Sequence, residues 1–172
     1  MYNKITINGE TFNAVFGNYI NNKREFQIVS DEFRKNPNVE IKLPQRATRK
    51  SACYDFYAPI SYLDIQPNQV VKIWTDVKAS MNEDNVLLLQ IRSSMGGKWE
   101  LNNVQGIIDS DYYENESNDG NIGIFLKNIS DTPQDILKGD RICQGMFTTY
   151  LTTFNDEPIS EERNGGFGST NN

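Results

Sequence analysis

The sequence contains no histidine and only two cysteines among its 172 residues. Without histidine the chain cannot form a Ser-His-Asp or Cys-His nucleophile system, an HExxH zinc site or a His₃ zinc site. Two cysteines cannot by themselves supply a four-thiolate zinc site or an iron–sulfur cluster. An enzyme with this composition works with carboxylates, hydroxyls, Arg, Lys, backbone amides or a hard, oxygen-liganded cation such as Mg²⁺.

Long apolar runs and excess positive charge are also missing. No stretch approaches the roughly 18 apolar residues of a transmembrane helix, and the N-terminus lacks a signal-peptide core. We therefore expect a cytoplasmic protein in which Cys53 and Cys143 are reduced. The 17 Lys and Arg against 23 Asp and Glu give a net charge of −6. This balance predicts no membrane or direct nucleic-acid binding, although a local Arg cluster or Mg²⁺ can still hold an anionic small substrate.

Short runs of strand-forming residues, separated by Pro, Gly, Asn and Asp, recur along the chain. The runs cover residues 39–43, 70–77, 86–91, 122–126 and 145–151. This pattern predicts an all-β sandwich or barrel, and the length predicts one domain, over residues 1–162. The best helix candidate is residues 30–36, which begin at Ser30. Residues 1–45 are predicted to be an N-terminal extension that packs on this domain.

Residues 92–98, Arg-Ser-Ser-Met-Gly-Gly-Lys, directly follow a strongly apolar run. A strand that ends in a cation, two hydroxyls and two glycines can present a concave set of donors to phosphate oxygens. The alternative is an ordinary turn with an exposed Arg92. The segment is not the phosphate loop of P-loop NTPases, because the glycine spacing and the Lys-Ser/Thr ending are absent.

Residues 103–113 place Asp109 and Asp111 after an apolar pair. On an extended chain the two carboxylates share a face, and one of them could act as a general base on a water molecule. The alternative is a turn-forming Asp-Ser-Asp. The following residues 114–120 are predicted to be a solvated hairpin connection.

Two further segments carry isolated polar groups. Asp55 is the only acid in residues 51–58, which alternate like a strand, and it could be a core hydrogen-bonding group or an indirect metal contact. Residues 138–144 predict a turn that feeds a strand, with Asp140–Arg141 pairing as the structural interpretation and the Gln144 amide as the functional one.

The C-terminal residues 163–172 contain three glycines and one aromatic residue in a polar run. Such a segment is most simply a disordered tail. Arg163 and Phe167, however, lie among residues whose backbone amides can approach a ligand closely. The composition therefore also fits a flexible tail that orders over an anionic, aromatic-containing ligand.

The order of these segments is more specific than any one of them. The series SACYDFYAP, IRSSMGG, NVQGIIDSDYY, KGDRICQ and RNGGFGST, over about residues 46–170, resembles the five motifs of the trimeric deoxyuridine triphosphatase (dUTPase) family. The resemblance, which is to the variety of Gram-positive bacteria and their phages, implies a β jelly roll and a homotrimer with active sites shared between subunits. It implies hydrolysis of dUTP to dUMP and pyrophosphate with Mg²⁺ on the triphosphate. This reaction limits uracil in DNA and supplies dUMP for thymidylate synthesis. The resemblance also implies that the protein acts in a bacterial or phage-infected cell.

The resemblance assigns roles in the nucleoside half of the site. Asp109 matches the acid that activates the attacking water. Asn103 matches the residue that hydrogen-bonds uracil, aided by the backbone of the hairpin at Gly106 and Ile108. Tyr112 matches the aromatic residue under deoxyribose, which leaves no room for a 2′-hydroxyl.

It also assigns the phosphate half and the tail. Asp55 matches an acid that reaches the metal through water. The matches to phosphate contacts in the chain body are Arg92, Ser93, Ser94 and Gln144. In the tail, the matches are the γ-phosphate contact Arg163, the uracil-stacking Phe167, and the phosphate-closing Gly168, Ser169 and Thr170. An Asp base, two Arg, hydroxyls and Mg²⁺ supply what attack at the α-phosphorus needs, without histidine.

Three positions depart from the family pattern. Cys53 stands where Gly is usual and is expected to shift the loop around Asp55 slightly. Asn171 replaces a usual Gly and Ile91 a usual Pro, and both should be tolerated. Two alternatives remain at this point: a dCTP deaminase relative, which would use a Glu base, and a nucleotide-switched jelly-roll trimer that serves as a regulatory or binding module.

Overall fold

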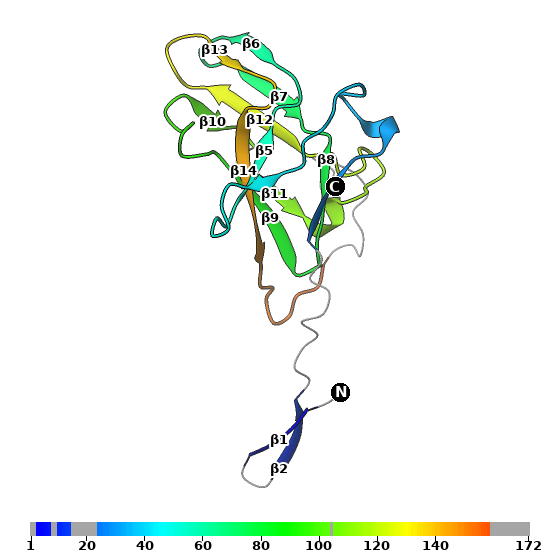
Figure 1. Ribbon diagram of the computed structural model, residues 1–172. Coiled ribbons are helices and arrows are strands. Elements are labelled where there is room, and N and C mark those ends of the chain that lie inside the picture. Colours follow the sequence, from blue (N-terminus) through cyan, green and yellow to red (C-terminus); the bar gives the residue numbers. More distant parts are fainter. Residues whose placement is uncertain (1–2, 8–9, 15–23, 104, 159–172) are drawn as a thin grey trace.

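The computed structural model describes residues 3–7, 10–14, 24–103 and 105–158 (Figure 1). These residues form fourteen β-strands and two short 3-10 helices. None of the helices within these ranges is long and apolar enough to cross a membrane. The predicted all-β class is therefore confirmed.

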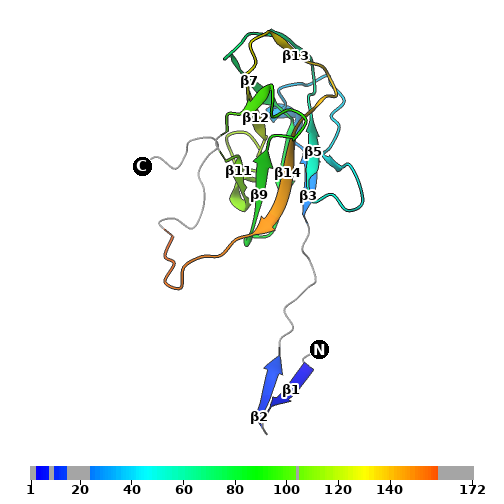
Figure 2. The ribbon, with the colours of Figure 1, turned by 90° about the vertical axis from the view of Figure 1, so that its left-hand side faces the viewer.

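A five-stranded antiparallel sheet carries most of the candidate site residues. Its strand order is β11-β9-β14-β5-β4, and Figure 2 shows β11, β9, β14 and β5 side by side. The strands are β11 (Ile107–Asp109), β9 (Asn85–Gln90), β14 (Arg141–Thr149), β5 (Tyr54–Tyr57) and β4 (Gln45–Arg46).

A three-stranded sheet completes the sandwich. Its order is β10 (Trp99–Leu101), β12 (Gly123–Asn128) and β7 (Val70–Trp74). Apolar side chains of both sheets meet in one buried cluster, whose fully buried members include Phe56, Leu87, Ile73, Ile124 and Leu126. Burial of this alternating set is the main favourable term in folding, and the resulting sandwich is the predicted jelly roll.

The described residues also form three two-stranded pairs. They are β1 (Asn3–Ile7) with β2 (Glu10–Ala14), β3 (Glu25–Ile28) with β8 (Val77–Ser80), and β6 (Tyr62–Ile65) with β13 (Gln134–Ile136). The β3–β8 pair runs from Glu25 opposite Ser80 to Ile28 opposite Val77. It joins the chain before the first predicted motif to the body of the domain. That residues 1–45 as a whole pack on the domain stays a prediction.

The predicted strand at residues 39–43 is wrong. These residues form no ladder, but Ile41 and Leu43 are half-buried and pack against the core. The alternating apolar residues of this segment therefore indicate burial, but the segment has no neighbouring strand among the described residues with which to pair. The predicted strand at residues 70–77 is divided into β7 and β8, because Asp76 has a positive φ of 54° that no strand accommodates. The other predicted strands correspond to β9, β12 and β14.

The predicted helix at residues 30–36 shortens to the 3-10 helix η1, Asp31–Phe33. It ends because Arg34 is already extended, with φ −65° and ψ 133°. The next two backbone N–H groups, of Lys35 and Asn36, donate to the fully buried Asp76 carboxylate at 2.8 Å each. A buried acceptor therefore binds the amides that would otherwise continue the helix.

Candidate active site

Asp55 lies in β5 and is only 5% exposed. Its Oδ1 accepts a hydrogen bond from Arg92 Nε at 2.8 Å, and its Oδ2 accepts one from Arg141 Nη1 at 3.4 Å. Two guanidinium groups therefore compensate one buried carboxylate, which would otherwise be costly to ionise at this depth. The sequence allows Asp55 to be either a core hydrogen-bonding group or an indirect metal contact. The structure shows a buried hydrogen-bonding group with charged partners.

Gln144 lies in β14, opposite Asp55 of β5 and opposite Gln90 of β9. Arg92 follows β9 directly, so the strand order brings three separate motifs to one end of the five-stranded sheet. We call Asp55, Arg92, Arg141 and Gln144 the phosphate cluster. A hollow of about 250 Å³ beside it is lined by Arg92, Met95, Trp99, Asp135, Ile136, Asp140, Arg141 and Ile142.

The segment after β9 forms consecutive tight turns. Met95 N donates to Arg92 O, and Lys98 N donates to Met95 O, both at 2.9 Å. Arg92 Nη1 donates to Ser94 Oγ at 3.1 Å, whereas Ser93 is exposed. The turn interpretation is therefore confirmed. The phosphate interpretation stays a prediction, for which this turn offers the Arg92 guanidinium with the Ser94 hydroxyl beside it.

Arg141 is a residue whose position the sequence did not indicate. The sequence suggested Asp140 as its partner, but the Asp140 carboxylate accepts the Leu137 backbone N–H at 2.8 Å and closes the turn. Arg141 instead reaches Asp55 of the neighbouring strand. No local signal reveals this pair, because the two residues are 86 positions apart in the chain.

The hairpin that leads to Asp109 is tight. Gly106 has a φ of +58°, and its N–H donates a hydrogen bond to Asn103 O. Its carbonyl oxygen accepts a hydrogen bond from Leu89 N at 2.8 Å. β11 follows and pairs Asp109 with Val86 at the start of β9. Asp109 is half-buried, and Ile108 is 6% exposed, so Ile108 can offer a ligand little beyond its backbone.

Asp109 and Asp111 do not share an extended face, contrary to the prediction. The chain turns directly after Asp109 into the 3-10 helix η2, Ser110–Tyr112, and Tyr113 N approaches Ser110 O at 3.4 Å. Asp111 is exposed on this turn, whereas Asp109 belongs to the strand. The turn interpretation of Asp-Ser-Asp is therefore correct for the backbone, and it separates the two acids.

Asn103 and Tyr112 both make structural hydrogen bonds. Asn103 Nδ2 donates to Gly123 O at 2.9 Å, and its Oδ1 accepts from Phe125 N at 2.7 Å, so the side chain braces the hairpin against β12. The predicted uracil contact would therefore use the hydrogen-bonding capacity that remains on this amide. Tyr112 is 4% exposed, and its hydroxyl donates to Asn121 O at 2.9 Å.

Asp109 and the phosphate cluster lie toward opposite ends of β9. Asp109 lies opposite Val86, whereas Gln144 lies opposite Gln90. Val86 and Gln90 are about 13 Å apart at the usual rise of a strand. We call Asn103, Asp109 and Tyr112, which the resemblance assigns to the nucleoside half of the site, the nucleoside cluster. Within one chain the phosphate cluster is held together by hydrogen bonds and strand pairing, whereas Asp109 lies toward the other end of β9.

The two cysteines are reduced and unpaired. Cys143 is fully buried in the core, and burial, reinforced by the Asp55 charge, raises the pKa of its thiol far above the ordinary value. It therefore remains a protonated, unreactive thiol. Cys53 is half-buried, and its Sγ accepts a hydrogen bond from Gln90 Nε2 at 3.3 Å, next to the intact Asp55–Arg92 pair.

Among the described residues, no three or more Asp, Glu, Cys or His side chains form a group that could hold a metal ion. Both oxygens of the Asp55 carboxylate already face guanidinium groups. Mg²⁺ commonly binds through one or two carboxylates together with substrate phosphates and retained waters. The residues fit a Mg²⁺ ion that would arrive on a triphosphate and that Asp55 would contact through water.

The tail residues Arg163, Phe167, Gly168, Ser169 and Thr170, with Asn171, lie outside the described residues. Their assigned roles stay predictions, as does the boundary of the tail at residues 163–172.

A jelly-roll sandwich with an arginine-compensated buried acid and a separate aspartate at a tight hairpin defines a class of nucleotide hydrolase. The dUTPase family model matches residues 39–171. The chain therefore belongs to the dUTPase family. The predicted activity, hydrolysis of dUTP by a dUTP diphosphatase, is confirmed, and the deaminase alternative is set aside.

Relatives agree with this assignment. The deoxyuridine 5′-triphosphate nucleotidohydrolase of Lactococcus lactis is 39% identical over 150 residues, which cover 86% of this chain and 97% of that protein. The crystal structure of a Streptococcus mutans dUTPase has a TM-score of 0.64 at 34% identity and covers 74% of this chain and 97% of that one. A mutant dUTPase of Staphylococcus aureus phage phi11, described with a structural Mg(II) ion, has a TM-score of 0.60 at 23% identity, over 81% and 98% of the chains. This last likeness shows the fold alone.

Proposed function

We propose that Asp109 activates the water molecule that attacks the α-phosphorus of Mg-dUTP, and that each active site joins the nucleoside cluster of one subunit to the phosphate cluster of another in a homotrimer. The observation that carries this proposal is the separation of Asp109 from the phosphate cluster along β9. A triphosphate bound at Arg92 and a water bound at Asp109 of the same chain would be too far apart for in-line attack.

The chemistry is distributed over the two clusters. Asp109 accepts a proton from the water, for which a half-buried carboxylate is a suitable general base. Arg92 and Gln144 offer donors to the phosphate oxygens, and Arg141 forms an ion pair with Asp55 beside them. Mg²⁺ on the triphosphate would supply further charge neutralisation. Release of pyrophosphate then leaves dUMP.

The surface around β9 supports contact between copies. An apolar hollow of about 760 Å³ is lined by Leu88, Leu89, Gln90, Ile91, Gly96, Trp99, Glu100, Leu101, Gln105, Ile129 and Met146. Ile107 and Ile129 are 49% and 44% exposed. Apolar surface of this kind is costly in water and is commonly covered by a partner. A second copy of the chain is the occupant that would also bring in the missing cluster.

The tail and the location complete the proposal. Residues 163–172 are proposed to close over the bound nucleotide, with Phe167 stacking on uracil and Arg163 on the γ-phosphate. A cytoplasmic location, in a bacterium or a phage-infected cell, follows from the substrate, which is a precursor in the nucleotide pool from which DNA is made.

Subunit complementation tests this arrangement. Asp109→Asn and Arg92→Ala are each expected to lose activity on dUTP by about 10²- to 10⁴-fold, which is the usual contribution of one acid–base or phosphate-binding group. When the two inactive variants are unfolded together and refolded as mixed trimers, sites that combine intact clusters from different subunits should reappear. Random assembly predicts about a quarter of the wild-type activity.

The controls separate assembly from chemistry. Each variant refolded alone must stay inactive, and the trimer must be seen by sedimentation or light scattering. Mixed trimers without activity would show that both clusters must come from one chain. Near-normal turnover by Asp109→Asn alone would refute its role as the base.

A further inference from the structure

Residues 114–120, in the connection between η2 and β12, are not the solvated hairpin that their composition predicted. Asn115, Asn118, Asp119 and Asn121 are 7%, 8%, 7% and 0% exposed. We call residues 113–121 the polar loop. Side chains of this kind are buried only when their hydrogen bonds are satisfied, so the loop contains a specific network rather than a flexible link.

The polar loop forms hydrogen bonds with both the backbone and the side-chain hydroxyl of Tyr112. Asn115 Nδ2 donates to the Tyr112 backbone carbonyl at 2.7 Å. The Tyr112 hydroxyl donates to Asn121 O at 2.9 Å and accepts a hydrogen bond from Asn118 Nδ2 at 2.7 Å. A phenol with one donated and one accepted hydrogen bond has little freedom to rotate, so the ring is fixed in one orientation.

Asn118 is the centre of this arrangement. Besides contacting the Tyr112 hydroxyl, its Oδ1 accepts from Asn115 Nδ2 at 2.7 Å and from Gly120 N at 3.0 Å. Gly120 has a φ of +76°, and a Cβ there would lie 2.8 Å from Tyr112 O. The loop therefore packs directly against the Tyr112 backbone at a position where only glycine fits.

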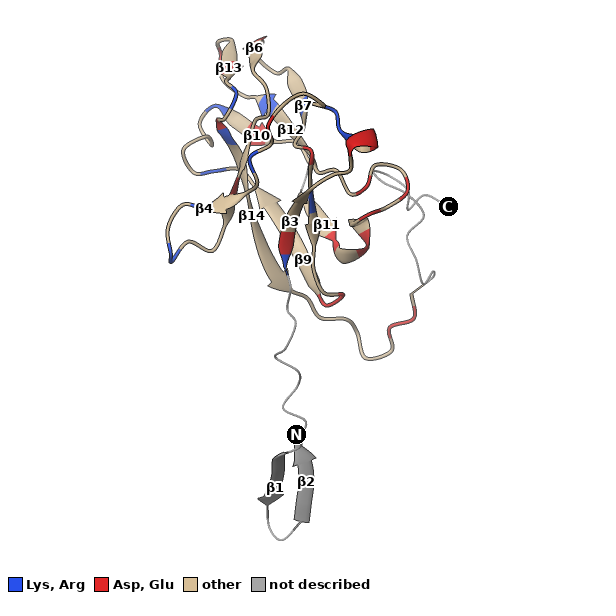
Figure 3. Cartoon of the chain, turned by 45° about the vertical axis from the view of Figure 1, so that its right-hand side comes forward, with Lys and Arg blue, Asp and Glu red and all other residues tan. Residues whose placement is uncertain are grey.

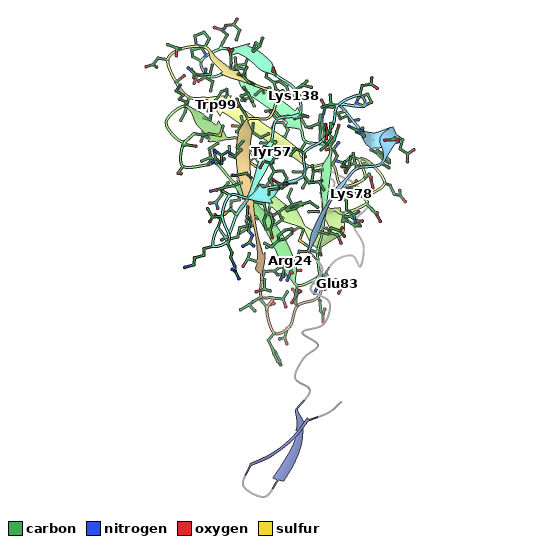
Figure 4. All side chains as sticks on the ribbon, viewed as in Figure 1. Arg24, Tyr57, Lys78, Glu83, Trp99 and Lys138 are labelled. Atoms are coloured by element: carbon green, nitrogen blue, oxygen red, sulfur yellow. The ribbon has the colours of Figure 1, made fainter. Side chains whose placement is uncertain are left out.

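The chain before the family-matched region anchors the polar loop from outside. Ser30 N donates to Asp119 Oδ2 at 2.7 Å, and Nζ of Lys78 donates to the same carboxylate at 2.9 Å. Lys78 lies in β8 (Figure 4). Asn121 Nδ2 donates to Asp76 Oδ1 at 2.9 Å, and Tyr113 OH donates to Gln27 Oε1 at 2.7 Å. These contacts fix the loop to β3, β8 and the turn between β7 and β8.

We propose that Asn118 is a positioning residue, which orients the Tyr112 ring through its hydroxyl for the deoxyribose of the substrate. The inference rests on the proposed function and on the role under deoxyribose that the family resemblance assigns to Tyr112. The Tyr112 ring belongs to the buried core cluster, and the two hydrogen bonds to its hydroxyl fix the angle at which the ring would meet a ligand. Discrimination against ribonucleotides depends on that angle. The 2′-hydroxyl adds one oxygen atom, and the Tyr112 ring can exclude it sterically only if the ring does not move aside.

A double-mutant cycle tests the proposal. Tyr112→Phe removes one oxygen and keeps the ring, Asn118→Ala removes the partner amide, and the third variant combines them. For each, kcat and KM are measured with dUTP and with UTP, and the Kd is measured for the imido analogues of both nucleotides. Glu116→Gln, an exposed change in the same loop, is the matched control and is expected to behave like wild type.

The expected result is a loss of sugar discrimination. Either single change should lower the ratio of dUTP to UTP in kcat/KM by about five- to twentyfold, as for one lost buried hydrogen bond. The double variant should be no worse than Tyr112→Phe in this ratio, because Asn118 acts through the hydroxyl that Tyr112→Phe already lacks. The analogue Kd ratio should change in parallel.

The outcomes that overturn the proposal are distinct. A lower Tm with an unchanged dUTP to UTP ratio would make the pair merely structural, and additive effects on the ratio would show that Asn118 acts elsewhere. If Asn118→Ala does not fold, Tyr112→Phe decides: an unchanged ratio refutes the proposal. The proposed function fails separately, by normal turnover of Asp109→Asn or by absence of activity in complementation.

Discussion

Arg92 Nε donates to Asp55 Oδ1 at 2.8 Å, so the residue matched to phosphate binding and the residue matched to metal binding are already paired. The pair is mostly buried, with side-chain exposures of 19% for Arg92 and 7% for Asp55. Arg141 adds a second cation on the other carboxylate oxygen. In the proposed site, Arg92 would meet the triphosphate in an orientation that Asp55 has set in advance, which would lower the ordering cost of binding.

Replacement of Asp55 by Asn should disturb this orientation. We expect Asp55→Asn to lower kcat/KM for dUTP by about 10- to 100-fold, because two guanidinium groups lose their charged partner and the Mg²⁺ contact weakens. Half-saturation by Mg²⁺ should move to higher concentration. The measurement is pyrophosphate release over a Mg²⁺ titration, with the exposed Asp131→Asn as control. Unchanged Mg²⁺ dependence would remove Asp55 from the metal contact.

The sequence predicted the parts of this site better than their arrangement. The strands around Leu87, Ile124 and Met146 followed from apolar runs, and the motif order identified Asp55, Arg92 and Asp109. The Asp55–Arg141 pair could not be predicted, since it depends on the register of β5 and β14. Strand pairing is set by the whole core rather than by the residues beside it.

Burial of the polar loop was missed for a different reason. Its composition, Glu-Asn-Glu-Ser-Asn-Asp-Gly, is typical of an exposed turn. The partners that satisfy it include Ser30 and Lys78, which are 89 and 41 positions from Asp119 in the chain. A polar segment is buried when distant partners complete its hydrogen bonds, and composition carries no information about them.

Gly106 should be required for stability as well as for the hairpin. A Cβ at this position would lie 2.8 Å from Leu89 Cβ and 3.0 Å from Leu89 O, at a φ of +58°. We expect Gly106→Ala to lower the free energy of unfolding by about 2–4 kcal/mol, through backbone strain and overpacking. Urea unfolding measures this change. Gly97→Ala, with no atom within 4 Å of the added Cβ, is the stability control and should change it little.

Removal of the tail should separate folding from turnover. We expect a chain that ends at residue 162 to keep the Tm and trimer mass of the full chain, because the core lies within the described sandwich. Its kcat/KM for dUTP should fall by about 10- to 100-fold or more, because loss of the Phe167 ring that is proposed to stack on uracil would alone account for this range. Activity and sedimentation are measured on the same preparation. Loss of the trimer on truncation would instead make the tail an assembly element.

The Lys78–Asp119 pair should make stability depend on pH in the acid range. Acidic residues of η1 and of the η2 region lie on one side of the molecule (Figure 3), and Lys78 is the buried cation there. Burial alone would raise the pKa of the Asp119 carboxyl, but the Ser30 N–H and the Lys78 ammonium outweigh it and hold the pKa below the ordinary value. The hydrogen bonds to Asp119 and Glu114 likewise outweigh burial and raise the pKa of Lys78.

The sign of the effect follows from these directions. A carboxyl whose folded pKa is lowered contributes stability that is present above its unfolded pKa and is lost as the pH falls through the folded pKa. The raised pKa of Lys78 leaves its contribution complete below its unfolded pKa, so it is constant in the same range. Asp119→Asn should therefore cost about 1–3 kcal/mol of unfolding free energy at neutral pH, as for hydrogen bonds to a charged group. The difference from wild type should shrink below about pH 4, near the ordinary pKa of Asp. Urea unfolding from about pH 3 to pH 8 checks this, with Glu116→Gln as control, and a difference that stays constant over the whole range would show that the charge of Asp119 contributes nothing.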